Sequence, residues 1–143
     1  MTRISPYLTF DGNCKEAFDF YRSVFGGEFM YVGYFKDMPP DPKYPIQESE
    51  MNLIMHISLP IGNGAILMGS DSTRGHGKPV IKGTNFSISL HPETKDEATR
   101  IFNTLAKEGE VEVPLNDTFW GSYYGMLIDQ FGIQWMINWS NQT

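Results

Sequence analysis

The sequence predicts an α+β fold built from two similar modules, each with the element order βαβββ and each forming a curved mixed sheet. Short segments in which apolar and polar residues alternate indicate strands. Two longer segments carry apolar residues with the spacing of amphipathic helices. The order of these elements in the first half of the chain repeats in the second half. A length of 143 residues suits two half-domains that share a core.

The predicted first module, residues 1–72, opens with a strand and a helix. Alternation over residues 5–10 indicates the strand. We expect Asn13 to cap the N-terminus of the helix, with Glu16 three residues later completing a capping box. The helix should end at the glycine pair that follows Phe25. Its apolar face, which we expect to be buried, consists of Ala17, Phe20, Tyr21 and Val24.

Three further strands complete the first module, and we expect them at residues 28–35, 53–59 and 65–70. The last two are joined by a turn of hairpin length that is rich in glycine. Residues 36–50 contain four prolines, which prevent regular structure. The sequence therefore predicts a long loop here, of the kind that often serves as a lid or binding element.

The second module is predicted at residues 85–143, after a glycine-rich linker at residues 73–84. Its strands are expected at residues 85–90, 111–115, 123–128 and 133–139. The apolar face of its helix consists of Ala98, Ile101, Phe102 and Leu105. These residues match the first helix face at one constant offset, and the last strands of the two modules also correspond. Two such modules, set together as one domain, are expected to enclose a small-molecule cleft.

Composition excludes several classes of function. The formal net charge is −6, which disfavours binding to nucleic acid or to an acidic membrane surface. The one cysteine, Cys14, permits neither an intramolecular disulfide nor a cysteine-based zinc site. The sequence shows no signal peptide and no apolar run long enough to span a membrane, so we expect a cytoplasmic protein.

Two segments carry a resemblance to a known family. One runs from Pro6 to Ala17, and the other from Thr118 to Asn138. The second segment contains the motif Phe-Trp, then Gly, then Asp-x-Phe-Gly-x-x-Trp-Met. The chain resembles the vicinal-oxygen-chelate superfamily of glyoxalases, bleomycin resistance proteins and dioxygenases, and most closely its PhnB-like branch. That branch is often described as similar to 3-demethylubiquinone methyltransferase. The resemblance implies a glyoxalase-like fold and a homodimer, but one scaffold in this superfamily supports many chemistries.

The resemblance also implies where a metal would bind. Metal-using members place four ligands on the first and last strands of the two modules, which gives roughly Ser5, Met68, Asn85 and Met136 here. Two thioethers, a hydroxyl and an amide are a poor ligand set for a divalent cation, and the neighbouring Tyr7 and Ser87 do not improve it. We therefore expect no metal and no other cofactor; a divalent metal is possible but has no support from these residues.

The same placement predicts a ligand cleft with an apolar floor surrounded by hydroxyl groups, suited to a neutral organic molecule. Alternatively, these side chains fill the space and leave no cavity. The aromatic loop residue Trp120 could close over a ligand or plug an interface. The predicted cleft residues are Tyr7, Thr9, His56, Ile66, Met68, Asn85, Ser87, Trp120, Tyr124 and Met136.

Other reactive residue types have simpler interpretations. His76 is expected in the linker and His91 in a turn. Asp71 and Asp129 could act as an acid–base pair, but each follows or begins a turn, and aspartate commonly stabilises turns. Cys14 at a helix start could be an activated thiol, but packing is the simpler role. Trp135 and Trp139, opposite in parity to Met136, are expected in the core.

Three hypotheses for function remain. The first is metal-independent binding of a small organic molecule, as in a sequestering protein. The second is a metal-dependent lyase or dioxygenase of the glyoxalase type. The third is a structural or regulatory dimer without a true ligand cavity. Catalytic residues, the ligand and the pathway are not identified by the sequence.

Overall fold

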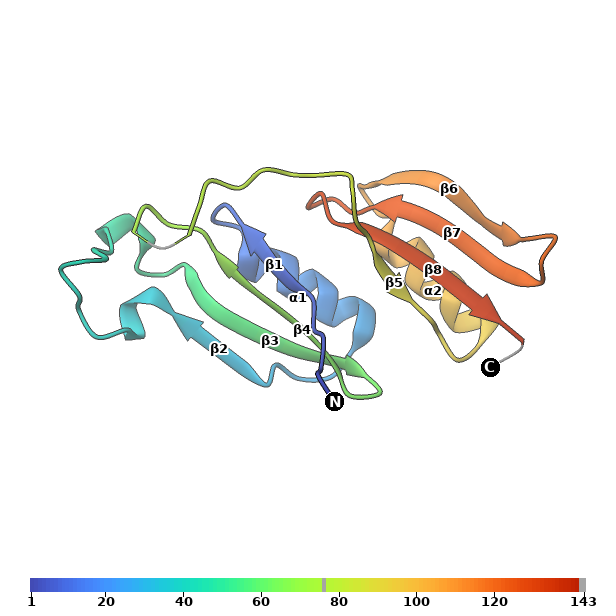
Figure 1. Cartoon of the computed structure of the whole chain (residues 1–143), viewed down its shortest axis with the longest axis horizontal. Helices are drawn as coiled ribbons and strands as arrows, with labels where there is room; N and C mark the ends of the chain where they lie inside the picture. Colours follow the sequence, from blue (N-terminus) through green and yellow to red (C-terminus); the bar gives the residue numbers. More distant parts are fainter. Residues whose placement is uncertain (76, 142–143) are drawn as a thin grey trace. The chain divides into compact units, whose positions relative to one another are not determined.

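A computed structural model describes residues 1–75 and 77–141 (Figure 1). The chain forms two compact units, Met1–Ile81 and Lys82–Thr143, and the boundary lies within the predicted linker of residues 73–84. His76, one of the residues considered above, lies outside the described residues. Over the described residues, each unit contains one α-helix and a four-stranded mixed sheet, so the predicted α+β fold with two βαβββ modules is confirmed.

Unit 1 (Met1–Ile81) has its strands in the order β1-β4-β3-β2. The first strand pairs parallel to the last, and the other pairs are antiparallel. Asn63 and Gly64 turn the chain between β3 and β4 with φ angles of 49° and 78°, values that suit asparagine and glycine. The elements are β1 (Tyr7–Phe10), α1 (Cys14–Phe25), β2 (Tyr31–Tyr34), η1 (Phe35–Asp37), η2 (Glu48–Glu50), β3 (Ile54–Gly62) and β4 (Ala65–Asp71).

Unit 2 (Lys82–Thr143) repeats this topology, with the strand order β5-β8-β7-β6. Its first strand is again parallel to its last, and its other pairs are antiparallel. Thr94 caps the helix, and its hydroxyl oxygen accepts a hydrogen bond from the backbone N–H of Glu97. The elements are β5 (Ile88–Leu90), α2 (Lys95–Leu105), β6 (Glu110–Asp117), β7 (Ser122–Ile128) and β8 (Gln134–Ser140).

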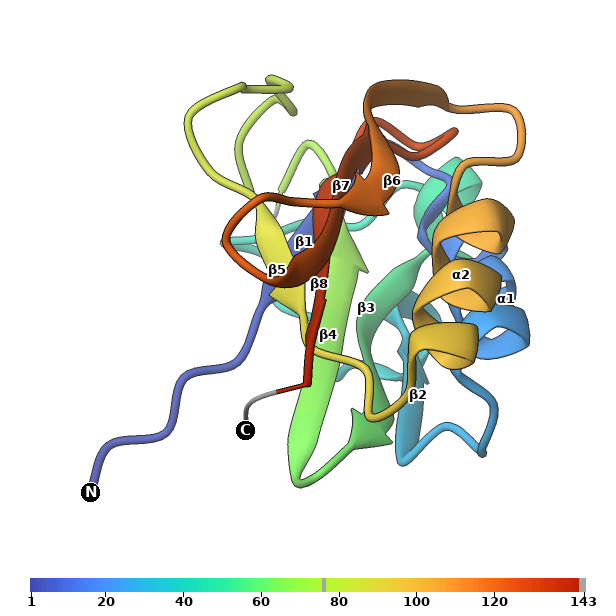
Figure 2. The ribbon, with the colours of Figure 1, turned by 90° about the vertical axis from the view of Figure 1, so that its right-hand side faces the viewer.

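In each unit the helix lies across one face of its own sheet (Figures 1 and 2). Alternate strand residues point toward the helix and are buried, including Leu8, Ile57 and Leu67 in unit 1 and Leu127, Trp135 and Ile137 in unit 2. This burial of apolar surface is the main source of stability. The other residues of each strand point to the opposite face, which we call the helix-free face of the unit.

Several predicted details were wrong. Phe18, not Phe20, is fully buried on the face of α1. The loop at residues 36–50 begins within the 3₁₀ turn η1 and ends with the 3₁₀ turn η2, so it is less irregular than four prolines suggested. The strand expected at residues 85–90 begins only at Ile88, whereas the strand expected at 111–115 extends through Glu110–Asp117. Sheet pairing, which the sequence does not reveal, sets these boundaries.

The N-terminus of α1 is not capped as predicted. Asn13 occupies the N-cap position, but within the described chain its side chain makes no capping hydrogen bond. The Oδ1 atom of Asp71, at the end of β4, accepts hydrogen bonds from the backbone N–H groups of Gly12 and Cys14, each at 3.0 Å. A distant carboxylate therefore replaces the local cap, which ties the helix start to the sheet.

Among the described residues, no helix is both long enough and apolar enough to cross a membrane.

Candidate ligand-binding faces

Register places four side chains in one row across the helix-free face of unit 1. Tyr7 pairs with Met68, Met68 with Ser58, and Ser58 with Tyr31. In a pleated sheet, directly opposed residues point to the same face. The row therefore runs over all four strands and combines two phenols, a thioether and a hydroxyl.

His56 lies beside this row, between the two tyrosines. Its ring stacks on Tyr7 with 5.6 Å between centroids, and Tyr31 contacts it at 5.8 Å. The Oη atom of Tyr7 lies 3.2 Å from Nδ1 of His56, within hydrogen-bond distance. Gly33, the ladder partner of His56, makes room for Tyr31, because a Cβ atom there would collide with the Tyr31 ring. These contacts hold the imidazole in one orientation.

The helix-free face of unit 2 has a similar apolar row. Ser89 pairs with Met136, and Met136 with Met126. Next to this row, Tyr124 pairs with Asn138. The Oδ1 atom of Asn138 is buried, and no hydrogen-bond partner for it is found among the described residues. Two thioethers and an unsatisfied amide oxygen thus lie on one face.

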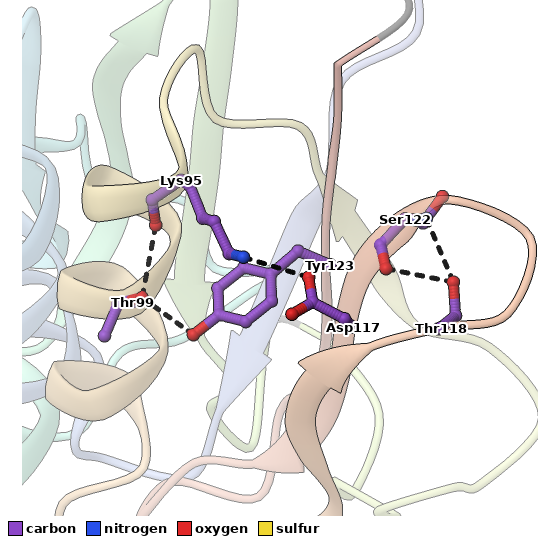
Figure 3. A network of polar contacts seen from close by, with 6 residues as sticks. All are labelled: Lys95, Thr99, Asp117, Thr118, Ser122 and Tyr123. Atoms are coloured by element: carbon purple, nitrogen blue, oxygen red, sulfur yellow. Dashed lines mark hydrogen bonds and ion pairs between the residues drawn. The ribbon is translucent and has the colours of Figure 1, made fainter.

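The hairpin between β6 and β7 presents exposed aromatic side chains. Phe119 is 98% exposed and Trp120 61% exposed, and their rings meet edge to face at 4.9 Å. Trp120 also contacts Tyr124, at 6.5 Å between centroids. At the base of the turn, the Thr118 hydroxyl accepts a hydrogen bond from the Ser122 N–H at 3.0 Å (Figure 3).

A polar network anchors this hairpin to α2 (Figure 3). Lys95 forms an ion pair with Asp117 at 2.9 Å, and its ammonium group lies 4.7 Å from the centroid of the Tyr123 ring. The Tyr123 hydroxyl lies 2.9 Å from Oγ1 of Thr99 on the helix. Tyr123 therefore points to the helix and Tyr124 to the helix-free face, as alternation along the strand requires.

The predicted cleft residues fall into two groups on separate units. Unit 1 brings together Tyr7, Thr9, His56, Ile66 and Met68 on its helix-free face. In unit 2, Tyr124 and Met136 lie on strands, Trp120 lies in the hairpin turn, and Ser87 immediately precedes β5. Asn85 was misplaced, because it is exposed and lies outside the shortened first strand.

Sequence reasoning missed the contribution of Tyr31 and Ser58 to the face of unit 1. Their place depends on the register between β2, β3 and β4, which a single sequence does not specify. The aromatic character of residues 28–35 and the alternation of β3 were the only available signals.

The predicted proline-rich loop borders a separate hollow in unit 1. Its volume is about 620 Å³, within the range of small-molecule pockets. None of the predicted cleft residues lines it. The lining residues are Met38, Pro39, Pro40, Asp41, Tyr44, Gly75 and Gly77.

Comparisons with known proteins agree with this architecture. The family model of the Glyoxalase/Bleomycin resistance protein/Dioxygenase superfamily matches residues 3–137. The chain belongs to this superfamily. It is 33% identical to Protein YjdN of Escherichia coli over 141 residues, which cover 94% of this chain and 93% of that protein.

Solved structures share the superfamily fold. The crystal structure of protein PA1353 from Pseudomonas aeruginosa has a TM-score of 0.82 and 39% identity, with 98% of each chain covered. A putative 3-demethylubiquinone-9 3-methyltransferase, PhnB protein, from Bacillus cereus has a TM-score of 0.74 and 24% identity, covering 97% of this chain and 100% of that one. The second likeness concerns the fold alone, and it places a PhnB protein among the structural neighbours.

Superfamily membership raises the question of a metal, and the residues present do not fit one. Where the first and last strands pair in each unit, the opposed side chains are Tyr7 with Met68 and Ser89 with Met136. Hard and borderline dications prefer carboxylate and imidazole ligands over uncharged thioethers and hydroxyls. Ser5 and Asn85, the other two predicted positions, precede β1 and β5 respectively. In the part of the chain that the structure describes, no three His, Cys, Asp or Glu side chains cluster as metal ligands would.

Asp71 lies in unit 1 and Asp129 in unit 2, and each carboxylate has a structural role within its own unit. The two oxygens of Asp71 accept backbone N–H groups from Gly12, Cys14 and Ile54. Burial raises the pKa of Asp71, and these hydrogen bonds oppose part of the increase.

Asp129 organises the turn before β8. Its Oδ1 atom accepts N–H groups from Phe131 and Ile133, and its Oδ2 atom accepts the indole N–H of Trp135 at 2.8 Å. Trp135 is fully buried, as its parity predicted. The carboxylate therefore satisfies the polar atom of a core tryptophan.

Cys14 is not an activated thiol. It is fully buried, and this burial raises the pKa of the thiol, with a further contribution from the nearby Asp71. A reactive cysteine requires the opposite shift, toward the thiolate. The side chain acts as a small apolar group in the core of unit 1.

Proposed function

We propose that the protein binds a small, neutral organic molecule without a metal, using the helix-free face of unit 1. The observation that carries this proposal is the row Tyr7–Met68–Ser58–Tyr31, with His56 held between the two tyrosines. Ser58 is buried, but the half-exposed Tyr7 and Tyr31 offer apolar ring area together with fixed polar groups, which is the usual make-up of a small-molecule site.

The chemistry of this face favours an uncharged ligand. Besides this row and His56, the face carries Thr9, Ile66 and Ser70, none of them an acid, lysine or arginine. The chain as a whole is acidic, with a formal net charge of −6, which disfavours an anionic ligand. Half-exposed tyrosine rings suit the flat surface of an aromatic molecule.

A homodimer is part of the proposal. The superfamily resemblance implies it, and several large apolar side chains in unit 2 are exposed, notably Val111, Val113, Phe119 and Trp120. Exposed apolar patches of this kind commonly mark interfaces. Sedimentation equilibrium is expected to give a mass of two chains, and a monomer at micromolar concentration would contradict this part of the proposal.

Ligand-observed NMR on chelator-treated protein tests the binding function. We expect saturation transfer to neutral aromatic compounds, and we expect Tyr31→Ala or Met68→Ala to weaken it by about tenfold or more, since each removes contact area worth about 1–2 kcal/mol. Phe86→Ala is the matched control, because it removes an exposed aromatic ring of unit 2 that lies outside the proposed site and the proposed dimer interface. Binding that survives both changes in unit 1 would refute the proposed site.

A further inference from the structure

We propose that Tyr7 and His56 form a proton-relay pair that catalyses keto–enol tautomerisation of a neutral aryl carbonyl compound. The inference rests on the proposed function, because the relay acts on a ligand bound to the helix-free face of unit 1. It adds an enzymatic activity to binding, and it requires no metal.

The geometry that supports the relay is a single fixed contact. Oη of Tyr7 and Nδ1 of His56 lie 3.2 Å apart, so one proton can be shared between them. The stacked Tyr7 ring on one side and Tyr31 on the other hold the imidazole. A catalytic pair needs this kind of fixed orientation, which exposed side chains normally lack.

The second ring nitrogen of His56, Nε2, is the atom of the imidazole that can exchange a proton with a bound ligand. Within residues 1–75 and 77–141, the only hydrogen-bond contact of the His56 ring is the one at Nδ1, so Nε2 has no protein partner there. If Nδ1 carries the proton, it donates to Tyr7 Oη, the Tyr7 O–H can donate to a ligand, and Nε2 can accept. If Nε2 carries the proton, Tyr7 donates to Nδ1, and the outward donor and acceptor exchange places.

This exchange matches the proton balance of a tautomerisation. Nε2 of His56 takes a proton from the carbon next to the carbonyl, and the C–H electron pair forms the new C=C bond. The carbonyl π electrons move to oxygen, which takes the Tyr7 hydroxyl proton. Tyr7 Oη then takes the proton from Nδ1. The products are the enol and His56 in its other tautomer; no net charge and no co-reactant are needed, and the reverse reaction restores the start.

The surroundings of the pair define the substrate class. Tyr7 and Tyr31 are each 48% exposed, so both rings offer area for stacking an aromatic group beside the relay. The chain is acidic, and the described strand residues of this face include no lysine or arginine, which favours a neutral molecule over a carboxylate. An aryl ketone with an α C–H group meets both requirements.

Deuterium exchange of 1-tetralone, a neutral aryl ketone with an α CH₂ group, tests the relay. The purified full-length protein is mixed with 1-tetralone in D₂O buffer, and the loss of the α-proton signals is followed by NMR. We expect exchange about 100-fold faster than in Tyr7→Phe or His56→Gln protein, the lower range of general acid–base catalysis. His91→Gln is the matched control, since His91 is an exposed histidine of unit 2 whose contact is with Ser89.

Binding and exchange are measured on the same samples. Tyr7→Phe keeps the stacking ring, so it should still show saturation transfer to 1-tetralone while losing exchange. Saturation transfer with exchange no faster in the wild type than in Tyr7→Phe would overturn the relay and leave the proposed binding function intact. An absence of saturation transfer from wild-type protein would overturn the assigned substrate class. Thermal unfolding confirms that each variant is folded.

Discussion

The carboxylate of Asp71, the last residue of β4, accepts the backbone N–H of Cys14, the first residue of α1, at 3.0 Å. The same side chain also bonds Gly12 and Ile54, so it connects the helix start, the turn before it and the first residue of β3. One buried side chain of β4 thus joins the turn and helix start at Gly12 and Cys14 to the start of β3.

Replacing Asp71 is expected to destabilise the fold strongly. Asp71→Ala leaves buried N–H groups without an acceptor, each costing about 1–3 kcal/mol, so we expect a loss of about 2–4 kcal/mol after partial relaxation. Urea unfolding followed by circular dichroism measures it. Asp19→Asn, which removes only an exposed ion pair with Lys15, should change the stability by less than about 0.5 kcal/mol. Equal effects of the two changes would contradict the role given to Asp71.

The raised pKa of Asp71 predicts a pH dependence with a definite sign. Burial makes the native state hold the Asp71 proton more tightly than the unfolded chain, whose value is about 3.8. This contribution to stability is therefore present below about pH 3.8 and is lost as the pH rises through the native pKa. The unfolding free energy of the wild type minus that of Asp71→Asn should therefore decrease as the pH rises through this window. Urea unfolding at a series of pH values measures this difference. A difference that grows with pH would indicate a lowered pKa instead.

Cys14 should be inert in the folded protein. Because the thiol is buried and its pKa is raised, Ellman's reagent is expected to react only after denaturation. Cys14→Ser with Ser23→Cys places the thiol at an exposed site on the same helix, and this variant should react at once when folded. Rapid reaction of the native wild-type thiol would show that the core of unit 1 opens readily.

Trp135→Phe is expected to cost about 2–4 kcal/mol. The change removes the hydrogen bond from the indole to Asp129 and leaves a void beneath α2. Trp120→Phe, on the exposed hairpin, is the matched control and should stay within about 0.5 kcal/mol of the wild type. Thermal unfolding of both variants makes the comparison, and similar midpoints would mean that Trp135 does not anchor unit 2.

The fold could be predicted from the sequence because its signals are local. Alternation located most of the strands, and spacing placed Ala17, Tyr21, Ala98 and Phe102 on buried helix faces. The Asp71 cap could not be predicted in the same way, since it bonds residues more than fifty positions away. The local pattern instead favoured Asn13, whose side chain has no capping role.

The candidate site could be predicted only in part, for a similar reason. Parity along β1 and β4 correctly grouped Tyr7 with Met68. The placement of Tyr31 beside His56 depends on the register between β2 and β3, in which Tyr31 pairs with Ser58 and Gly33 with His56, and nothing in the sequence marks that register. Asn85 was misplaced because the alternation of apolar and polar residues starts at residue 85, whereas β5 begins only at Ile88.

The central claim, that a neutral ligand binds without a metal, is tested most directly by calorimetry. The affinity of the best neutral aromatic compound is measured in chelator-containing buffer and again with excess Zn²⁺ or Ni²⁺. We predict the same Kd in both, because Tyr7, Met68, Ser89 and Met136 are a poor ligand set for these cations. A Kd at least tenfold lower with metal, or binding that requires it, would contradict the account and point to a metal-dependent member of the superfamily.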